Sequence, residues 1–87
     1  MSPSSFSFKL GVPNDPDSTA IIGEMARHAA EYAQLEAAAV QAFAERAQAA
    51  AAKAFKAGGA TSQATFAAAE GALTMTIGGE SVSERLS

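Results

Sequence analysis

Residues 58–79, with the sequence GGATSQATFAAAEGALTMTIGG, decide which fold class the chain is expected to adopt. Glycine pairs bound the stretch at both ends, and the alanine run in its middle favours a helix because alanine is the best helix former. Leu73, Met75 and Ile77, however, alternate with threonines, which is typical of a strand. We predict a helix over about 61–77, ended by the second glycine pair, and keep a strand at its C-terminal end as the alternative.

The region before the first glycine pair predicts one long helix. Asp15 can cap the first free backbone N–H groups, and Pro16 suits the first helical position, where its missing N–H costs nothing. No proline follows Pro16, and no glycine follows Gly23 until Gly58. Two lysines lie in the last turns, where positive charge is favourable. We therefore expect a continuous helix over about 16–57, roughly 60 Å long.

Together these elements predict an all-α fold, an unequal helical hairpin over residues 16–79. An extended arm (1–15) precedes it and a polar tail (80–87) follows, within a single domain. The second helix, if it folds back, reaches only about 25 Å and covers the first helix to about Gln41. The more apolar half of the first helix then lacks a partner within the chain, which indicates an oligomer.

The N-terminal arm contains a short strand pattern. Phe6, Phe8 and Leu10 alternate with Ser7 and Lys9, and an isolated strand is stable only if it pairs or packs. The two phenylalanines favour docking, and a free tail is the alternative.

Composition excludes several classes of protein. Alanine supplies 23 of the 87 residues, cysteine is absent, and the net charge is −3. Since the six basic residues are scattered, nucleic-acid binding is not expected. The N-terminus lacks a signal-peptide pattern, and no window is apolar enough for a membrane span. The compartment stays open: we expect a cytoplasmic protein or one exported by a leaderless route.

The sequence predicts no catalytic, cofactor-binding or metal site. Glu24, His28 and Glu31 have a spacing that could share a metal, but glutamate-rich helices produce such surface pairs often. Thr61 or Ser62 is better explained as a helix cap than as a nucleophile, because no base or glycine-framed serine accompanies it. We expect the protein not to be an enzyme.

An apolar stripe on the long helix is the predicted interface. At about 100° per residue, Glu36 falls inside the stripe. Its carboxylate either reaches solvent along the side chain, or sets the register of an interface by pairing with Arg46 or with a basic residue of a neighbouring chain. The predicted interface comprises Ile21, Ile22, Met25, Tyr32, Leu35, Glu36, Val40 and Phe43, with Phe6 and Phe8 from the arm.

The predicted function follows from this stripe. We expect a self-assembling structural subunit, either a coiled-coil oligomer or a filament, pilus or needle-like helical assembly, and hence a homo-oligomer. The alternative is a small helical adaptor or chaperone that binds a helix of another protein through the same stripe.

Overall fold

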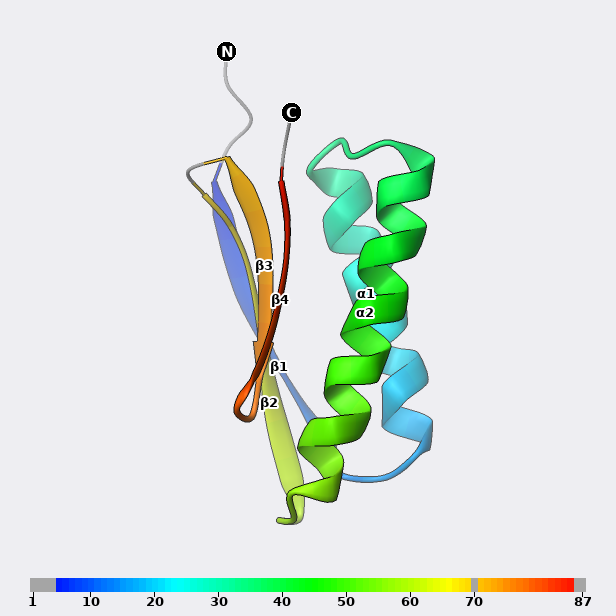
Figure 1. Cartoon of the computed structure of the whole chain (residues 1–87). Coiled ribbons are helices and arrows are strands. Elements are labelled where there is room, and N and C mark those ends of the chain that lie inside the picture. Colours follow the sequence, from blue (N-terminus) through cyan, green and yellow to red (C-terminus); the bar gives the residue numbers. More distant parts are fainter. Residues whose placement is uncertain (1–4, 70, 86–87) are drawn as a thin grey trace.

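The computed structural model of the chain describes residues 5–69 and 71–85. It has an α+β fold in two layers, in which two helices pack on one face of a four-stranded antiparallel sheet (Figure 1). The expected all-α hairpin is therefore wrong, and with it the coiled coil and the helical filament. The elements in chain order are β1 (Phe6–Pro13), α1 (Asp17–Tyr32), α2 (Ala37–Lys56), β2 (Thr61–Ala69), β3 (Ala72–Ile77) and β4 (Glu80–Arg85).

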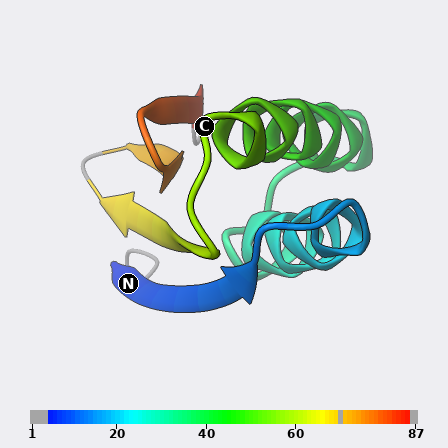
Figure 2. The same ribbon diagram turned by 90° about the horizontal axis from the view of Figure 1, so that it is seen from below.

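The sheet has the order β1-β2-β3-β4, so β1 and β4 are its two edges. The alternating pattern of the arm corresponds to β1, which pairs with β2 along its whole length. One row of side chains crosses the sheet from Phe8 through Phe66 and Met75 to Val82 and faces the helices. Figure 2 shows the resulting layers end-on, with the other face of the sheet uncovered.

The predicted helix over 61–77 is instead the β2–β3 hairpin. Every second residue of β2 from Ala64 to Ala68 is buried, and so are Leu73, Met75 and Ile77 of β3. Period-two burial of this kind places one whole set of side chains on a single face, which a helix cannot do with this sequence. Tertiary burial therefore outweighs the helix propensity of alanine.

The predicted polar tail is also partly wrong. Glu80–Arg85 forms β4, and residues 86–87 lie outside the described residues. The glycine pair at 78–79, expected to end a helix, is the two-residue turn between Ile77 and Glu80, with Gly78 at a φ of 58°. Glycine accepts such positive φ values without steric cost, which suits a tight hairpin.

The long helix over 16–57 is interrupted after Tyr32. Gln34 adopts a φ of 67°, its N–H donates to the Glu31 carbonyl, and the N–H of Leu35 donates to the Ala30 carbonyl. These two bonds form a Schellman motif, which usually has glycine at the left-handed position. Because glutamine occupies it here, the sequence carries no stop signal, and the end of α1 was not predicted.

The predicted start of α1 and end of α2 are confirmed. The Asp15 carboxylate accepts hydrogen bonds from the backbone N–H groups of Asp17 (2.9 Å) and Ser18 (3.2 Å). Helix α2 ends at Lys56, and Gly58 follows with a φ of 105°. The start of α1 and the end of α2 are therefore set by local sequence signals.

The core lies between the helices and the sheet, so the chain buries much of its own apolar stripe, while Ile21 and Tyr32 stay exposed. Buried small residues of α1 and α2 let the two helices pack closely. The fully buried large side chains come from both layers: Ile22, Phe43, Phe66, Leu73, Met75 and Ile77.

Candidate interaction site

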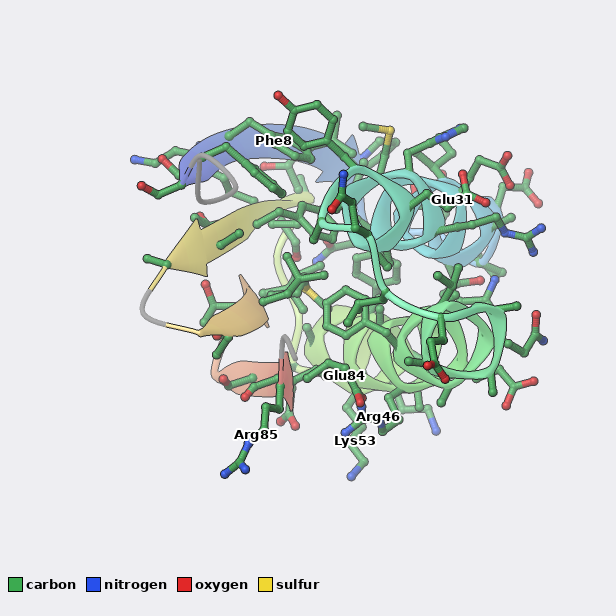
Figure 3. All side chains as sticks on the ribbon, turned by 90° about the horizontal axis from the view of Figure 1, so that it is seen from above. Phe8, Glu31, Arg46, Lys53, Glu84 and Arg85 are labelled. Atoms are coloured by element: carbon green, nitrogen blue, oxygen red, sulfur yellow. The ribbon has the colours of Figure 1, made fainter. Side chains whose placement is uncertain are left out.

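An apolar groove runs between β1 and α1, with a volume of about 670 Å³. Phe6 and Phe8 line it from the sheet, because alternate residues of β1 point to the helical face. Met25, Ala29 and Tyr32 line it from α1, where spacings of four and three residues place side chains on one helix face. The groove is therefore built by two elements at one edge of the sheet (Figure 3).

Four aromatic rings form a continuous chain along this groove and into the core. The ring of Tyr32 meets that of Phe6 edge-on at 5.1 Å between centroids. Phe6 stacks with Phe8 at 6.2 Å, and Phe8 stacks with the buried Phe66 at 5.1 Å. Tyr32 is nevertheless 69% exposed, so the outer end of this row of rings is accessible aromatic surface. Tyrosine is one of the residue types enriched at binding hot spots.

The rim of the groove on the α1 side is polar. His28 Nε2 lies 3.6 Å from Glu24 Oε2, and His28 Nδ1 lies 3.9 Å from Glu31 Oε1. All three side chains are more than half exposed, and exposed pairs of this spacing contribute only a few tenths of a kcal/mol, about 0.2–0.5. Within residues 5–69 and 71–85, no group of three or more histidine, cysteine, aspartate or glutamate side chains is placed to hold a metal ion.

Among residues 5–69 and 71–85, no strand pairs with the outer edge of β1, which presents its backbone groups beside the groove. The N–H of Asn14 donates to the carbonyl of Ala60 on the β2 side, at 3.0 Å. The one-to-one register continues from there without a bulge, and in an antiparallel ladder the residues bonded to a given neighbour alternate. Ser7, Lys9 and Gly11 therefore direct their N–H and C=O groups away from β2, at the open edge.

The β4 edge has the same backbone chemistry but different side chains. By the same alternation Ser83 directs its N–H and C=O groups away from β3. The neighbouring Glu84 forms an ion pair with Arg46 of α2, which ties this edge to the helical layer (Figure 3). Charged side chains of this kind discourage another strand from adding to an edge.

The structure separates the predicted interface residues into two groups. Ile22, Val40 and Phe43 are buried in the core of the chain, and Leu35 packs against that core. Phe6, Phe8, Met25 and Tyr32 meet in the groove, and Ile21 is 46% exposed on α1. The interface itself stays a prediction.

Glu36 does not pair with Arg46, whose guanidinium binds Glu84 instead. It is exposed and sits at the extended position just before α2 begins. Of the two interpretations of Glu36, the carboxylate that reaches solvent fits its place within the chain.

Sequence reasoning missed the open backbone edge and placed three groove residues, His28, Ala29 and Glu31, outside the predicted interface. The alternation of β1 was the one available signal for the edge. Because β2 and β3 were not predicted as strands, the sequence did not indicate that β1 would lie at the edge of a sheet. No sequence signal assigns these three residues to a groove, because their place there depends on β1 lying opposite α1.

The sequence matches no known family model, and no characterised protein is similar to it at a significant level. Among the described residues, neither helix is long and apolar enough to cross a membrane.

Proposed function

We propose that the chain is a protein-binding domain without catalytic activity, and that it binds an extended segment of polypeptide at β1. The observation that carries the proposal is the combination of two features at one place. The backbone groups of Ser7, Lys9 and Gly11 are open at the edge of the sheet, and the aromatic groove lies directly beside them.

An added strand would use both features together. It would lie about 4.8 Å from β1 and exchange backbone hydrogen bonds with the three open residues. Its alternate side chains would then point toward the helical layer and contact Phe6, Phe8 and Tyr32 in the groove. Backbone bonds would supply affinity, and the groove would select apolar or aromatic side chains.

A second candidate is a helix of another protein lying against α1. Ile21 and Tyr32 are the large apolar side chains that the described residues leave most exposed, and both lie on this helix. This arrangement would not use the open backbone edge. The type of peptide that binds therefore distinguishes the two candidates.

A selection of random twelve-residue peptides displayed on phage, with the purified chain as target, tests the proposal. The recovered peptides should alternate apolar with polar residues. Their affinity should fall at least tenfold for Ser7→Pro, which removes one outward N–H without breaking the β1–β2 ladder.

Ser83→Pro is the matched control. Ser7 and Ser83 end the same row across the outer face of the sheet, and both direct their N–H away from their neighbour strand. Binding should survive Ser83→Pro. Peptides with helical spacing of apolar residues, or peptides indifferent to Ser7→Pro, would contradict the proposal.

A further inference from the structure

We infer that the partner is a second copy of the chain, whose β1 pairs antiparallel with this β1 around a twofold axis at Phe8. The inference rests on the proposed function and names the partner for the same site. Strand β1 itself has the chemistry that the site takes, because Phe6, Phe8 and Leu10 alternate with small or polar residues. A twofold axis makes one edge complementary to itself.

The side chains of β1 restrict the possible registers. An axis at Lys9 would place two lysines directly opposite each other, which is destabilising. An axis at Leu10 would place Pro13 opposite Ser7, and an axis at Gly11 would place it opposite Lys9. Since proline has no N–H and the twofold axis repeats each contact, both arrangements lose two hydrogen bonds per dimer.

The axis at Phe8 avoids these costs. On the outer face it sets Ser7 opposite Lys9 of the partner copy, and on the helical face it sets Phe6 opposite Leu10. Ser7 and Lys9 both direct backbone groups outward, so each such pair can exchange two hydrogen bonds. An axis at Ser7 would pair only residues 6–8 of β1, whereas the axis at Phe8 pairs residues 6–10.

The groove then closes from both sides. Because α1 lines the groove at the same edge as β1, the two copies of α1 come to flank the axis. Met25 and Tyr32 of both copies would cover the paired aromatic rings, including the Phe8 rings that meet at the axis. This pairing explains why a ring as exposed as that of Tyr32 packs on Phe6 beside an open edge.

Closure favours this pairing over a head-to-tail one. The chain carries a net charge of −3, but Lys9 is the one charged side chain between residues 5 and 13, so two β1 edges do not bring acidic groups together. Pairing of β1 with β4 would bring Lys9 toward Glu80 and Glu84, but it would leave an open edge at each end of the assembly. The β1 pairing closes on itself and ends at the dimer.

The dimer is expected to be weak. The contact is small compared with standard interfaces of about 1,600 Å², so a dissociation constant on the order of 10–100 µM is expected. Sedimentation equilibrium of the full chain from about 1 µM to 1 mM should show a monomer–dimer equilibrium without larger species. Ser7→Pro should weaken it at least tenfold, and Ser83→Pro should leave it unchanged.

A second variant tests the register and is not expected to disturb folding, because Ser7 is exposed. Ser7→Glu would place a carboxylate opposite Lys9 of the partner copy, twice per dimer, and should tighten the dimer about 2- to 30-fold. In the other registers residue 7 does not face Lys9. Ser83→Glu is the control, since residue 83 precedes Arg85 by two positions as residue 7 precedes Lys9.

The outcomes separate this inference from the proposed function. A wild-type chain that stays monomeric to 1 mM, about ten times the weakest expected dissociation constant, overturns the self-pairing, while peptide binding sensitive to Ser7→Pro would still support the β1 site. A dimer that Ser7→Pro does not weaken overturns the inference, because it must use another surface. A dimer that Ser7→Glu fails to tighten overturns the Phe8 register.

Discussion

The two edges of the sheet share their backbone chemistry and differ in their side chains. One row across the outer face begins at Ser7 on β1 and ends at Ser83 on β4, and both residues present free backbone groups. Strand β4 carries three charged side chains in six residues, and one of them pairs with Arg46 of α2. Strand β1 carries one charge in eight residues and borders an aromatic groove.

This difference indicates at which edge of the sheet another strand can be added. Edge strands in soluble proteins are usually protected by charge, shortness or cover. Strand β4 is short and charged, so it is protected in two of these ways. The β1 edge has only Pro13 near its end and Lys9 in its middle. The difference between a more protected and a less protected edge in one small sheet therefore supports the proposal that β1 is the side that binds.

The largest expected effect comes from removing the ring that joins the β1 edge to the core. Phe66 is fully buried and stacks on Phe8. Phe66→Ala should lower the free energy of unfolding by about 3–5 kcal/mol, through lost burial and a cavity. Urea denaturation followed by circular dichroism measures it. Thr76→Ala on the exposed outer face should change stability by less than about 0.5 kcal/mol, and similar losses for both variants would contradict the position of the core.

The next effect separates binding from stability at the groove. Tyr32→Ala removes an exposed ring whose described contact is with Phe6. We expect about 2 kcal/mol less association free energy, or roughly 30-fold weaker binding at the β1 site. The free energy of unfolding should fall by no more than about 1.5 kcal/mol. Sedimentation and urea denaturation of the same sample give the two values, and unchanged association would remove the groove from the site.

A smaller effect is expected where α1 ends, because this end sets the position of Tyr32 over the groove. Gln34 holds a φ of 67° without being glycine, which costs roughly 1 kcal/mol. Gln34→Gly should therefore raise the free energy of unfolding by up to about 1 kcal/mol, less the entropy that glycine adds to the unfolded chain. A shift of the urea midpoint to higher concentration checks it. A large destabilisation would show that the glutamine side chain itself is required.

The smallest effect is expected at the protected edge. Arg46→Ala removes the ion pair with Glu84, which is partly exposed to solvent. Such pairs contribute about 0.2–1 kcal/mol and weaken with salt. The midpoint temperature of thermal unfolding should differ slightly from that of wild type at low salt, and the difference should shrink as the salt concentration rises. Loss of binding at β1 in this variant would contradict the independence of the two edges.

Local sequence signals predicted the ends of several elements but not the fold class. The Asp15 cap, the glycine pair after α2 and the alternation of β1 all act between near neighbours. The same local reasoning failed at residues 61–77, where alanine favours a helix. What decides there is the pairing of Phe66 with Met75 in the adjacent strand β3 and with Phe8 in β1, which lies far away in the sequence.

The candidate site was partly predicted for the same reason. Phe6, Phe8, Met25 and Tyr32 were expected at an interface because they are large, apolar and on regular spacings. Their arrangement as a groove beside an open backbone edge could not be predicted, since it requires β1 to be a terminal strand. Ile22, Val40 and Phe43 share the same spacing signal, but the sheet covers them.

Residue-by-residue amide hydrogen exchange tests the central claim, that β1 is the binding edge, most directly. The exchange of Ser7 and Lys9 is compared with that of Ser81 and Ser83, at concentrations well below and well above the dimer dissociation constant. At low concentration both edges should exchange rapidly, because their N–H groups point to solvent. At high concentration Ser7 and Lys9 should become protected while Ser81 and Ser83 stay fast. Protection that appears at β4, or equally at both edges, would contradict the account.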